Sequence, residues 1–343
     1  KGNELMRAET AQDARDLVSA GRKNLIINGA MEVAQRATSL TGRTDSATVL
    51  TVDRFHHHSS GGTYNTSQQT VTNGGMPGLP IKFKNYLKFD VTTGANNCGV
   101  WQTIEDVRTV QGLHTCSFYA RGTNPSSGKY ELDFRQYFGS GGSSTTELTF
   151  DDVVLSSEWQ RYTFTFTPES LSGKTIGANS YFRMFLRQPD ADNTTNAYSF
   201  EITGVQLEAG GNATDFEHRS YGEELALCQR YFIRFSGSTG AHGTSVGDGG
   251  IATLANWATS SAYGPIFLGT EMRTAPSLAG FSGVRYFANG VQHTPSSSNV
   301  IIVGTMTNRV ELRINGLSNL LQGGAGWVRL ASTSDYMDFN AEL

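Results

Sequence analysis

The stretch Tyr162-Thr-Phe-Thr-Phe166 alternates aromatic and polar residues at every step. Because successive side chains of a β-strand point to opposite faces of a sheet, this period of two predicts a strand that is buried on one side. The stretches Tyr86-Leu-Lys-Phe-Asp-Val91 and Phe182-Arg-Met-Phe-Leu186 show the same period. Short runs of this kind, separated by loops rich in Asn, Gly and Ser, are typical of a β-sandwich.

Two further strands are predicted at 113–120 and 130–134, where the alternation continues. The stretch Phe200-Glu-Ile-Thr-Gly-Val-Gln-Leu207 changes phase at Gly204, which indicates a β-bulge. No amphipathic helices stand between these runs, so a parallel α/β sheet is excluded. The part of the chain over 24–216 is therefore predicted to be one all-β domain.

A second series of strands begins at residue 230. Between the two series, 217–229 is predicted to be a linker with a short helix, because Glu223 and Glu224 suit the first turn of a helix. We predict a second, C-terminal β-sandwich over 230–343. Its clearest strands lie at 231–235, 284–287, 299–303, 309–314 and 327–330.

The N-terminal part of the chain, 1–23, has a helical pattern over 3–19. Asn3 can cap this helix and Gly21 can end it. Its apolar residues form a thin stripe, which buries too little to stabilise a helix that stands alone in water. The helix is therefore docked on its own domain, or an expression remnant, or the end of a trimeric coiled-coil stem. The residues of the stripe are Leu5, Ala8, Ala11, Ala14 and Val18.

The composition of the chain limits its partners. The 343 residues are enough for two compact domains, and a formal net charge of -4 gives no basic field that would hold nucleic acid or an anionic membrane. No apolar run approaches the roughly 20 residues that span a bilayer, and no secretion signal can be read at the start. We therefore expect no nucleic-acid partner and no membrane insertion. Because the chain begins at Lys1 rather than Met, we expect residues upstream of it.

Three cysteines cannot form a closed set of disulfides, and none has CxxC spacing. We predict that they are buried small hydrophobic residues in a protein made in a reducing cytoplasm. These cysteines are Cys98, Cys116 and Cys228.

The stretches 24–32, 157–163 and 202–210 carry a resemblance to a known family. They resemble strands of the galactose-binding-like jelly rolls found in many carbohydrate-binding modules. Asn24-Leu-Ile-Ile-Asn-Gly-Ala-Met-Glu32 is similar to their first strand, and Ser157-Glu-Trp-Gln-Arg-Tyr-Thr163 to the strand that carries Trp-x-x-Tyr-Thr. The segment 202–210 is similar to their closing strand. The resemblance covers about 24–216, and it implies a jelly-roll β-sandwich whose first strand is at 24–32.

The resemblance also raises the question of a calcium site. Modules with structural calcium commonly bring a Glu from the first strand, here Glu32, toward acidic residues of the closing strand. This chain has Thr203 and Gly204 where those acids are expected. Because Ca²⁺ prefers about six to eight oxygen ligands that include carboxylates, we expect no metal site, although backbone carbonyls could still contribute.

The stretches 35–36, 53–55, 213–232 and 265–276 carry a further resemblance, to structural proteins of bacteriophages. Gln35-Arg36 and Asp53-Arg54-Phe55 are similar to the jelly rolls of phage and prophage proteins, and the stretch 213–232 looks like a signature of tail-fibre and receptor-binding proteins. Pro265-Ile-Phe-Leu268 followed by Met272-Arg-Thr-Ala-Pro276 looks like the C-terminal heads of phage fibres. The resemblance implies homotrimers whose heads meet the host, and it favours the trimeric stem as the interpretation of the N-terminal helix.

One stretch of the sequence matches the pattern of a catalytic motif. Gly243-Thr-Ser-Val-Gly247 fits the G-x-S-x-G pattern and lies beside His242 and Asp248. That nucleophile turn needs a buried strand before the serine and a helix after it, whereas this region is rich in Gly. We therefore predict a mobile loop here.

Acidic pairs and a histidine run could in principle serve catalysis or metal binding. The pairs Asp151 with Asp152 and Asp335 with Asp338 are expected instead to cap turns or to be solvated. The run His56-His57-His58 has no third ligand close in the sequence, and it is predicted to be an exposed polar strand end. We predict no enzyme activity, no catalytic residue, no metal and no cofactor.

Aromatic side chains are the candidates for binding sugar, because the apolar faces of sugars stack on rings while amides and carboxylates hold the hydroxyls. Any one such ring in a β-sandwich is more often part of the core than part of a site. The candidates are Trp257, Tyr263, Tyr286 and Trp327 in the second β-unit and Trp101 in the first.

The resemblance implies a phage tail fibre or receptor-binding protein, located in the virion and made in the host cytoplasm. It implies a homotrimer with multivalent adhesion to host cell-surface polysaccharide or lipopolysaccharide, and other tail proteins bound through the N-terminus. Two alternatives stay open: the noncatalytic carbohydrate-binding portion of a secreted polysaccharide-degrading enzyme, and a structural decoration or spacer of the virion. We place host recognition in 230–343, because its glycine- and serine-rich segments 236–250 and 290–299 are the kind of loop that carries binding residues.

Overall fold

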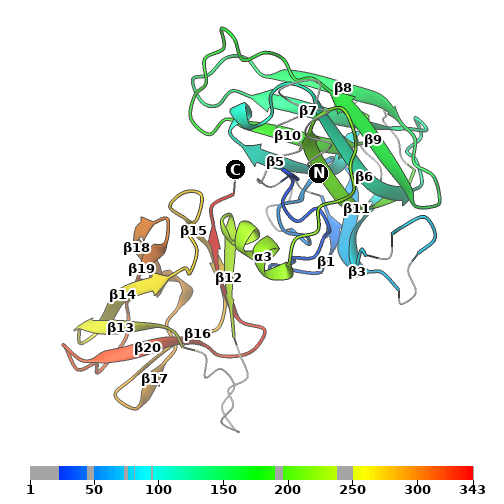
Figure 1. Ribbon diagram of the computed structural model, residues 1–343. Helices are drawn as coiled ribbons and strands as arrows, with labels where there is room; N and C mark the ends of the chain where they lie inside the picture. Colours follow the sequence, from blue (N-terminus) through cyan, green and yellow to red (C-terminus); the bar gives the residue numbers. More distant parts are fainter. Residues whose placement is uncertain are drawn as a thin grey trace, which may run out of the picture. The chain divides into compact units, whose positions relative to one another are not determined.

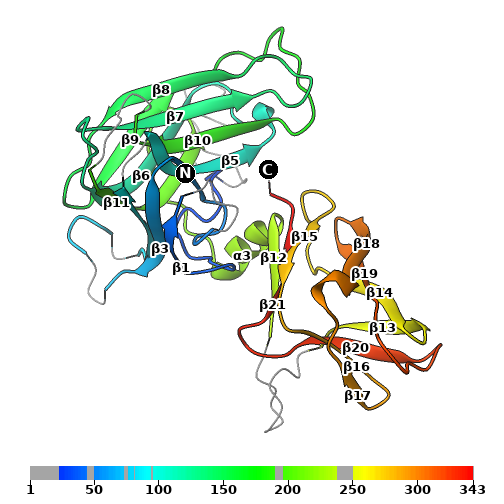
Figure 2. The same ribbon diagram turned by 180° about the vertical axis from the view of Figure 1, so that it is seen from behind.

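The computed structural model of the chain contains two compact units, which divide between Glu224 and Leu225. Figure 1 shows the chain from one side and Figure 2 from the opposite side. We call the part before the division unit 1 and the part after it unit 2. The helix predicted at 3–19 lies outside the residues that the structure describes. Those residues are 23–44, 50–72, 76–80, 82–93, 96–189, 196–237 and 250–342.

Unit 1 is built from two antiparallel sheets, and the all-β prediction is confirmed. Both sheets contribute to one core, so the unit is a β-sandwich. In spatial order, the six-stranded sheet consists of β1 (Ser39–Arg43), β3 (Thr63–Thr70), β4 (Asn85–Thr93), β11 (Tyr198–Ala209), β6 (His114–Gly122) and β9 (Gln160–Phe166). The five-stranded sheet consists of β2 (His56–Ser60), β5 (Asn96–Glu105), β10 (Tyr181–Arg187), β7 (Tyr130–Tyr137) and β8 (Thr146–Val153), with the short helix η1 (Val107–Thr109) after β5.

The period of two that predicted the strands places their apolar side chains on the inner faces. In β10, Phe182, Met184 and Leu186 are at most 4% exposed. The ring of Phe182 lies in a stack with Phe134 of β7 and Phe166 of β9, and the centroids of the last two rings are 3.9 Å apart. Rings from both sheets therefore meet in the core.

The three cysteines are buried, as predicted. The Sγ of Cys116 lies 3.7 Å from the Sδ of Met184, inside the core of unit 1. Burial raises the pKa of the Cys116 thiol well above its usual range, because the thiolate would have to leave water.

The first strand predicted for unit 1, at 24–32, is wrong, because the segment forms no ladder. Asn28 and Met31 have φ angles of 60° and 59°, a left-handed conformation that interrupts an extended run. The side chain of Asn24 also makes a hydrogen bond that a backbone N–H would make in a strand, since its amide donates to the carbonyl of Val205 at 3.0 Å. Two backbone hydrogen bonds hold the segment against β11 without making it a strand.

An arginine and two glutamates, Arg219, Glu217 and Glu224, close unit 1, and we call them the Arg219 clamp. Arg219 forms ion pairs at 3.3 Å with both glutamates and donates to the carbonyl of Asn24. Glu217 accepts from the backbone N–H of Asn24 at 2.7 Å, and Glu224 accepts from that of Asn28 at 2.5 Å. The side chain of Arg219 is 6% exposed. The clamp therefore joins the start of the described part of unit 1 to its end through charges that are almost out of water.

Helix α3 (Tyr221–Gln229) occupies most of the predicted linker. A capping box starts it: the carboxylate of Glu223 accepts from the backbone N–H of Ser220 at 2.9 Å, and the backbone N–H of Glu223 donates to the Ser220 hydroxyl at 3.3 Å. Acidic side chains also suit this end of a helix because of its dipole. In the described parts of the chain, no helix is long and apolar enough to cross a membrane.

Unit 2 is a second pair of antiparallel sheets that share one core, as predicted for the C-terminal β-sandwich. The three-stranded sheet consists of β12 (Phe232–Ser236), β21 (Tyr336–Asn340) and β15 (Ser277–Phe281). The seven-stranded sheet consists of β17 (Val291–His293), β16 (Val284–Ala288), β20 (Ala325–Leu330), β13 (Gly250–Ala258), β14 (Ser261–Phe267), β19 (Arg309–Ile314) and β18 (Val300–Met306), with the short helix η2 (Ser297–Asn299) before β18. The core contains Met337 and Phe339 from the smaller sheet and Leu254, Leu312 and Val328 from the larger one.

The phase change predicted at Gly204 is confirmed. The pairing of β11 with β6 shifts register between Thr203 and Gln206, and Gly204 has a φ angle of 63°. A Cβ built on Gly204 lies 2.6 Å from the Cζ of Phe83, which is closer than real Cβ atoms approach. Glycine is required here both for its backbone angle and for its lack of a side chain.

Replacing Gly204 by alanine is expected to lower the free energy of unfolding by about 3 kcal/mol, because a strained backbone angle and overpacking against Phe83 add together. Gly42 is a matched control, since its φ is also 63° and nothing lies within 4 Å of a Cβ built there. Gly42→Ala is expected to cost only about 1 kcal/mol. Urea denaturation of both variants measures the difference, and equal losses would show that Phe83 moves aside without cost.

Candidate functional site

The outer face of the five-stranded sheet carries rings and charges that the core does not use. The register defines one row across this face, because it pairs Trp101 with Phe185 and Phe185 with Asp133. Inner positions of the same strands fill the core, so the alternate positions can serve other contacts. The residues of this face include His56 on β2, Trp101, Thr103 and Glu105 on β5, Tyr181, Arg183, Phe185 and Arg187 on β10, Glu131, Asp133, Arg135 and Tyr137 on β7, and Glu147 on β8.

Trp101, the candidate predicted in the first β-unit, is half-buried on this face. Its ring stacks on that of His56, with centroids 4.1 Å apart and planes 9° apart. The guanidinium carbon of Arg183 lies 5.9 Å from the centroid of the Trp101 ring. Stacking holds the indole in one orientation, which a platform for a flat ligand requires.

The other aromatic residues of this face were not among the candidates predicted from the sequence. Phe185 is 3% exposed and lies between two guanidinium groups. Tyr137 and Tyr181 are both half-buried, and their ring centroids are 4.8 Å apart. A signal was present in the alternation of β10, which places Phe185 on the face opposite to Phe182, where a polar residue is expected.

Most charged side chains of this face are bound to one another. Arg135 pairs with Glu147. Arg187 pairs with Asp133 and, at 2.8 Å, with Glu131. Such charge-assisted pairs hold planar groups in fixed positions. They therefore make a rigid polar surface around the rings.

Arg183 differs from these arginines. The register places it between Thr103 and Arg135. Within the described residues its guanidinium makes no hydrogen bond or ion pair, and its Nε is buried without an acceptor. Burial lowers the pKa of Arg183, and the positive charge of Arg135 lowers it further. A cation that is partly out of water thus faces two rings instead of a carboxylate.

The prediction of an exposed strand end at 56–58 is wrong. Because β2 pairs with β5, His56 and His57 are only 7% and 1% exposed. His57 packs in the core, with its ring centroid 5.8 Å from that of Tyr64. Burial lowers the pKa of His57 to about 3, and the charges of His56 and Arg43 add to this effect. In the parts of the chain that the structure describes, no group of three or more His, Cys, Asp or Glu side chains could hold a metal ion.

Three of the sugar-binding candidates predicted in unit 2 lie on the outer face of the seven-stranded sheet. Trp257, Tyr263 and Trp327 are 73%, 38% and 46% exposed. Trp327 stacks on Phe287, which the sequence analysis missed, with ring centroids 5.0 Å apart and planes 26° apart. Unit 2 therefore offers a second aromatic face.

Tyr286, the fourth candidate in unit 2, lies in the core and not at the surface. It is 0% exposed, and its hydroxyl donates to the Oδ1 of Asn256 at 2.6 Å. Burial raises the pKa of this hydroxyl to about 12. The reason is the phase of β16, which turns Tyr286 inward and its neighbour Phe287 outward.

Of the other motifs, the G-x-S-x-G stretch at 243–247 lies outside the residues that the structure describes. Asp335 accepts from the hydroxyl of Ser332 at 2.7 Å, which is the turn-capping role expected of it. Asp338 pairs instead with Arg234 across β12 and β21, at 2.6 Å.

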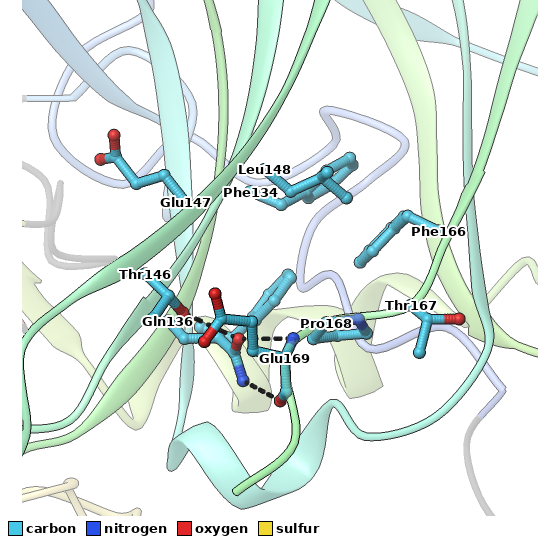
Figure 3. A pocket seen from close by; sticks show the side chains of 10 residues that line it. Phe134, Gln136, Thr146, Glu147, Leu148, Phe166, Thr167, Pro168 and Glu169 are labelled. Carbon is cyan, nitrogen blue, oxygen red and sulfur yellow. Dashed lines mark hydrogen bonds between the residues drawn. The ribbon is translucent and has the colours of Figure 1, made fainter. Parts of the chain in front are cut away.

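A pocket of about 140 Å³ lies between the two sheets of unit 1 (Figure 3). Phe134, Phe166 and Phe182 form its apolar wall. Its polar wall is Gln136, whose side chain bonds the backbone N–H and carbonyl of Glu169 at 2.9 and 3.0 Å. Pockets for small molecules typically measure about 300–1,000 Å³. We therefore interpret this space as a packing gap between the sheets and not as a ligand site, because the side chain of Gln136 is already hydrogen-bonded within the protein.

No family model matches the chain, and no curated protein matches it. Among solved structures, the enzymatically active domain of bacteriophage CBA120 tailspike protein 4 is similar to it at 10% identity and a TM-score of 0.33, over 54% of this chain and 21% of that one. A carbohydrate-binding module of the β-sandwich superfamily is similar at 13% identity and a TM-score of 0.30, over 51% and 64% of the two chains. The Stig cyclase Fisc from Fischerella sp. TAU is similar at 12% identity and a TM-score of 0.35, over 56% and 98%.

The chain spans less than two thirds of the tailspike domain and of the carbohydrate-binding module. Structural similarity at these TM-scores does not assign a function to the chain. The three proteins also differ in function, since they are a tailspike domain, a binding module and a cyclase. The class of the chain is defined by its own sheets. It is an all-β protein with a jelly-roll-like β-sandwich, a second β-sandwich, and an aromatic and charged outer face on one sheet.

Proposed function

We propose that the chain is a carbohydrate-binding protein, and that the outer face of the five-stranded sheet holds the glycan. Sugars present apolar faces that stack on rings, and hydroxyls that bond to planar polar groups. The observation that carries the proposal is that both kinds of group share this face, on which Trp101, Tyr137, Tyr181 and Arg183 are half-buried. Trp101 is held flat by His56, and the pairs of Arg135 with Glu147 and of Arg187 with Asp133 lie on the same face.

The fold alone does not account for these rings. The core of unit 1 has its own set of aromatic side chains on the inner faces of the same strands. The ring of Trp101 is only half-buried, so its burial stabilises the sandwich less than that of a core ring. An outer ring that is nevertheless oriented by a stack, as Trp101 is, suits contact with a ligand.

We extend this proposal to a phage tail fibre or receptor-binding protein that binds host cell-surface polysaccharide or lipopolysaccharide without catalysis. The stretches 213–232 and 265–276, which resemble such proteins, support it. Three weak sites on one trimeric body would gain avidity through effective concentration. The noncatalytic portion of a polysaccharide-degrading enzyme would bind the same class of ligand, and a structural spacer would bind none.

Replacing Trp101 by alanine is expected to weaken glycan binding about tenfold or more, which corresponds to about 1.4 kcal/mol for a lost stacking contact. A panel of bacterial surface polysaccharides is screened with the wild-type protein, and the best ligand is titrated by calorimetry. Tyr181→Ala is a second variant on the same face, in case loss of the indole disturbs β5. Circular dichroism checks that each variant is folded.

Trp257→Ala and Trp327→Ala are the matched controls, because these rings lie on the aromatic face of unit 2. They are expected to leave the affinity unchanged if the glycan sits on unit 1. Loss of binding in these variants, with binding kept in Trp101→Ala, would place recognition in 230–343, where the sequence analysis expected it. Failure of every polysaccharide to bind would leave the structural spacer as the function.

The oligomeric state is a separate expectation of the fibre proposal. Sedimentation equilibrium of the intact protein is expected to give three times the chain mass of 37.1 kDa. A monomer at micromolar concentration would contradict the trimer, and with it the avidity argument.

A further inference from the structure

Arg183 is a cation without a matching anion on a surface where its neighbours are paired. On the same face Arg135 pairs with Glu147, and Arg187 pairs with Asp133. In the described part of the chain Arg183 makes no hydrogen bond or ion pair, and its Nε is buried without an acceptor. Three carboxylates of this face, Glu131, Asp133 and Glu147, are thus bound to the two flanking arginines. A fourth, Glu105, lies opposite Tyr181 and not opposite Arg183.

The contacts that Arg183 does make leave its hydrogen-bonding capacity unused. Its guanidinium carbon lies 5.9 Å from the ring of Trp101 and 5.0 Å from the ring of Phe185. Such cation–π contacts are worth about 0.5–2 kcal/mol, and they satisfy none of the N–H donors. Taking a charge out of water without an opposite charge is costly, and the lowered pKa of Arg183 reflects this. An anion from outside would remove the cost.

Arg121 is a comparable arginine whose charge is paired with a carboxylate of the protein itself. On the outer face of the six-stranded sheet, Arg121 lies 5.3 Å from the ring of Trp159 and pairs with Glu201 at 2.6 Å. Arg183 has the same kind of ring contact but lacks the carboxylate. A ligand group can take the place that Glu201 fills beside Arg121.

From this geometry we infer that the glycan bound by the five-stranded sheet is acidic, and that Arg183 holds its anionic substituent beside the ring of Trp101. The inference rests on the proposed glycan binding and names the class of sugar. A carboxylate fits a guanidinium with two parallel hydrogen bonds, and a sulfate or phosphate substituent offers the same oxygens. The net charge of -4 provides no overall basic field, so the preference depends on this side chain.

The first test compares matched ligands on the intact protein. An acidic bacterial polysaccharide that contains uronic acid is titrated before and after its carboxyl groups are reduced to alcohols. The acidic form is expected to bind about tenfold more tightly or better, as a charge-assisted pair allows. Sulfated and phosphorylated oligosaccharides with the same neutral parent then show which anion is preferred.

The second test changes the side chain. Arg183→Gln is expected to lower the affinity for the acidic form to that for the reduced form, and Arg183→Lys to keep part of the preference. Arg121→Gln, the matched control, is expected to leave the preference unchanged. In the ligand-free protein Arg183→Gln is expected not to lower the melting temperature, because it removes an unmatched charge, whereas Arg121→Gln is expected to lower it.

The outcomes separate this inference from the proposed function. Equal binding of the acidic and reduced forms by the wild-type protein would overturn the inference and leave glycan binding in place. A preference that persists in Arg183→Gln would overturn it too, because another group would then bind the anion. Failure of all polysaccharides to bind would overturn the proposed function itself.

Discussion

Replacing Arg219 by methionine is expected to lower the free energy of unfolding of the intact protein by about 3–5 kcal/mol. Arg219 is 6% exposed and pairs with Glu217 and Glu224. Methionine fills a similar volume but leaves both carboxylates without their cation, and it removes the bond to the carbonyl of Asn24. Differential scanning calorimetry should show the loss in the transition of unit 1.

Arg108 is a matched control for this experiment. Like Arg219, it forms an ion pair with a carboxylate, here that of Asp106 at 2.9 Å. Its side chain, however, is 56% exposed. Arg108→Met is expected to cost less than about 1 kcal/mol, because water screens the pair and competes for it. Losses of equal size in the two variants would mean that the Arg219 clamp contributes no more than a surface ion pair.

Acidification is expected to destabilise unit 1 through His57. Burial lowers the pKa of His57 from 6.5 to about 3 in the folded protein, so the unfolded chain binds the proton first. The stability that His57 contributes is therefore complete above pH 6.5 and is lost as the pH falls from 6.5 toward 3. Between pH 7 and pH 5 this loss is about 2 kcal/mol.

The measurement is urea denaturation at pH 7, 6 and 5 for the wild-type protein and for His57→Gln, which cannot take up the proton. The variant is expected to be less stable at pH 7 and to lose about 2 kcal/mol less on acidification. His293→Gln, in β17 of unit 2, is the control and is expected to keep the pH dependence of unit 1. An unchanged dependence in His57→Gln would show that another group binds the proton.

The sequence predicted the strands whose apolar side chains follow a local period of two, such as β4, β9 and β10, and it missed others, such as β3, β5 and β8. The strand predicted at 24–32 is wrong, although the residues Asn-Leu and Asn-Gly there resemble those of a first strand. There the side chain of Asn24 bonds the backbone, and Asn28 adopts a left-handed angle. The prediction from sequence also failed for His56 and His57, whose burial depends on pairing with β5 and not on their own polarity.

The candidate site was predictable only in part, since a sheet face is assembled by register. Trp101 could be named from its residue type alone. Its partners in the same row, His56, Phe185 and Asp133, are far apart in the sequence and meet only when β2, β5, β10 and β7 pair. Tyr286 was misplaced for the opposite reason, because the phase of a short strand decides whether a ring faces the core or the solvent.

Because of the Arg219 clamp, the two ends of the described part of unit 1 lie next to each other. The backbone N–H of Asn24 and the carboxylate of Glu217 are 2.7 Å apart from donor to acceptor, although about the whole length of unit 1 separates them along the chain. A domain with adjoining ends tolerates circular permutation, and it can be gained or lost by recombination without spreading its flanking segments apart. Joining the ends near residues 23 and 224 by a short peptide, and opening the chain in the exposed turn 126–128, would reorder the strands while both sheets and the Arg219 clamp stay the same.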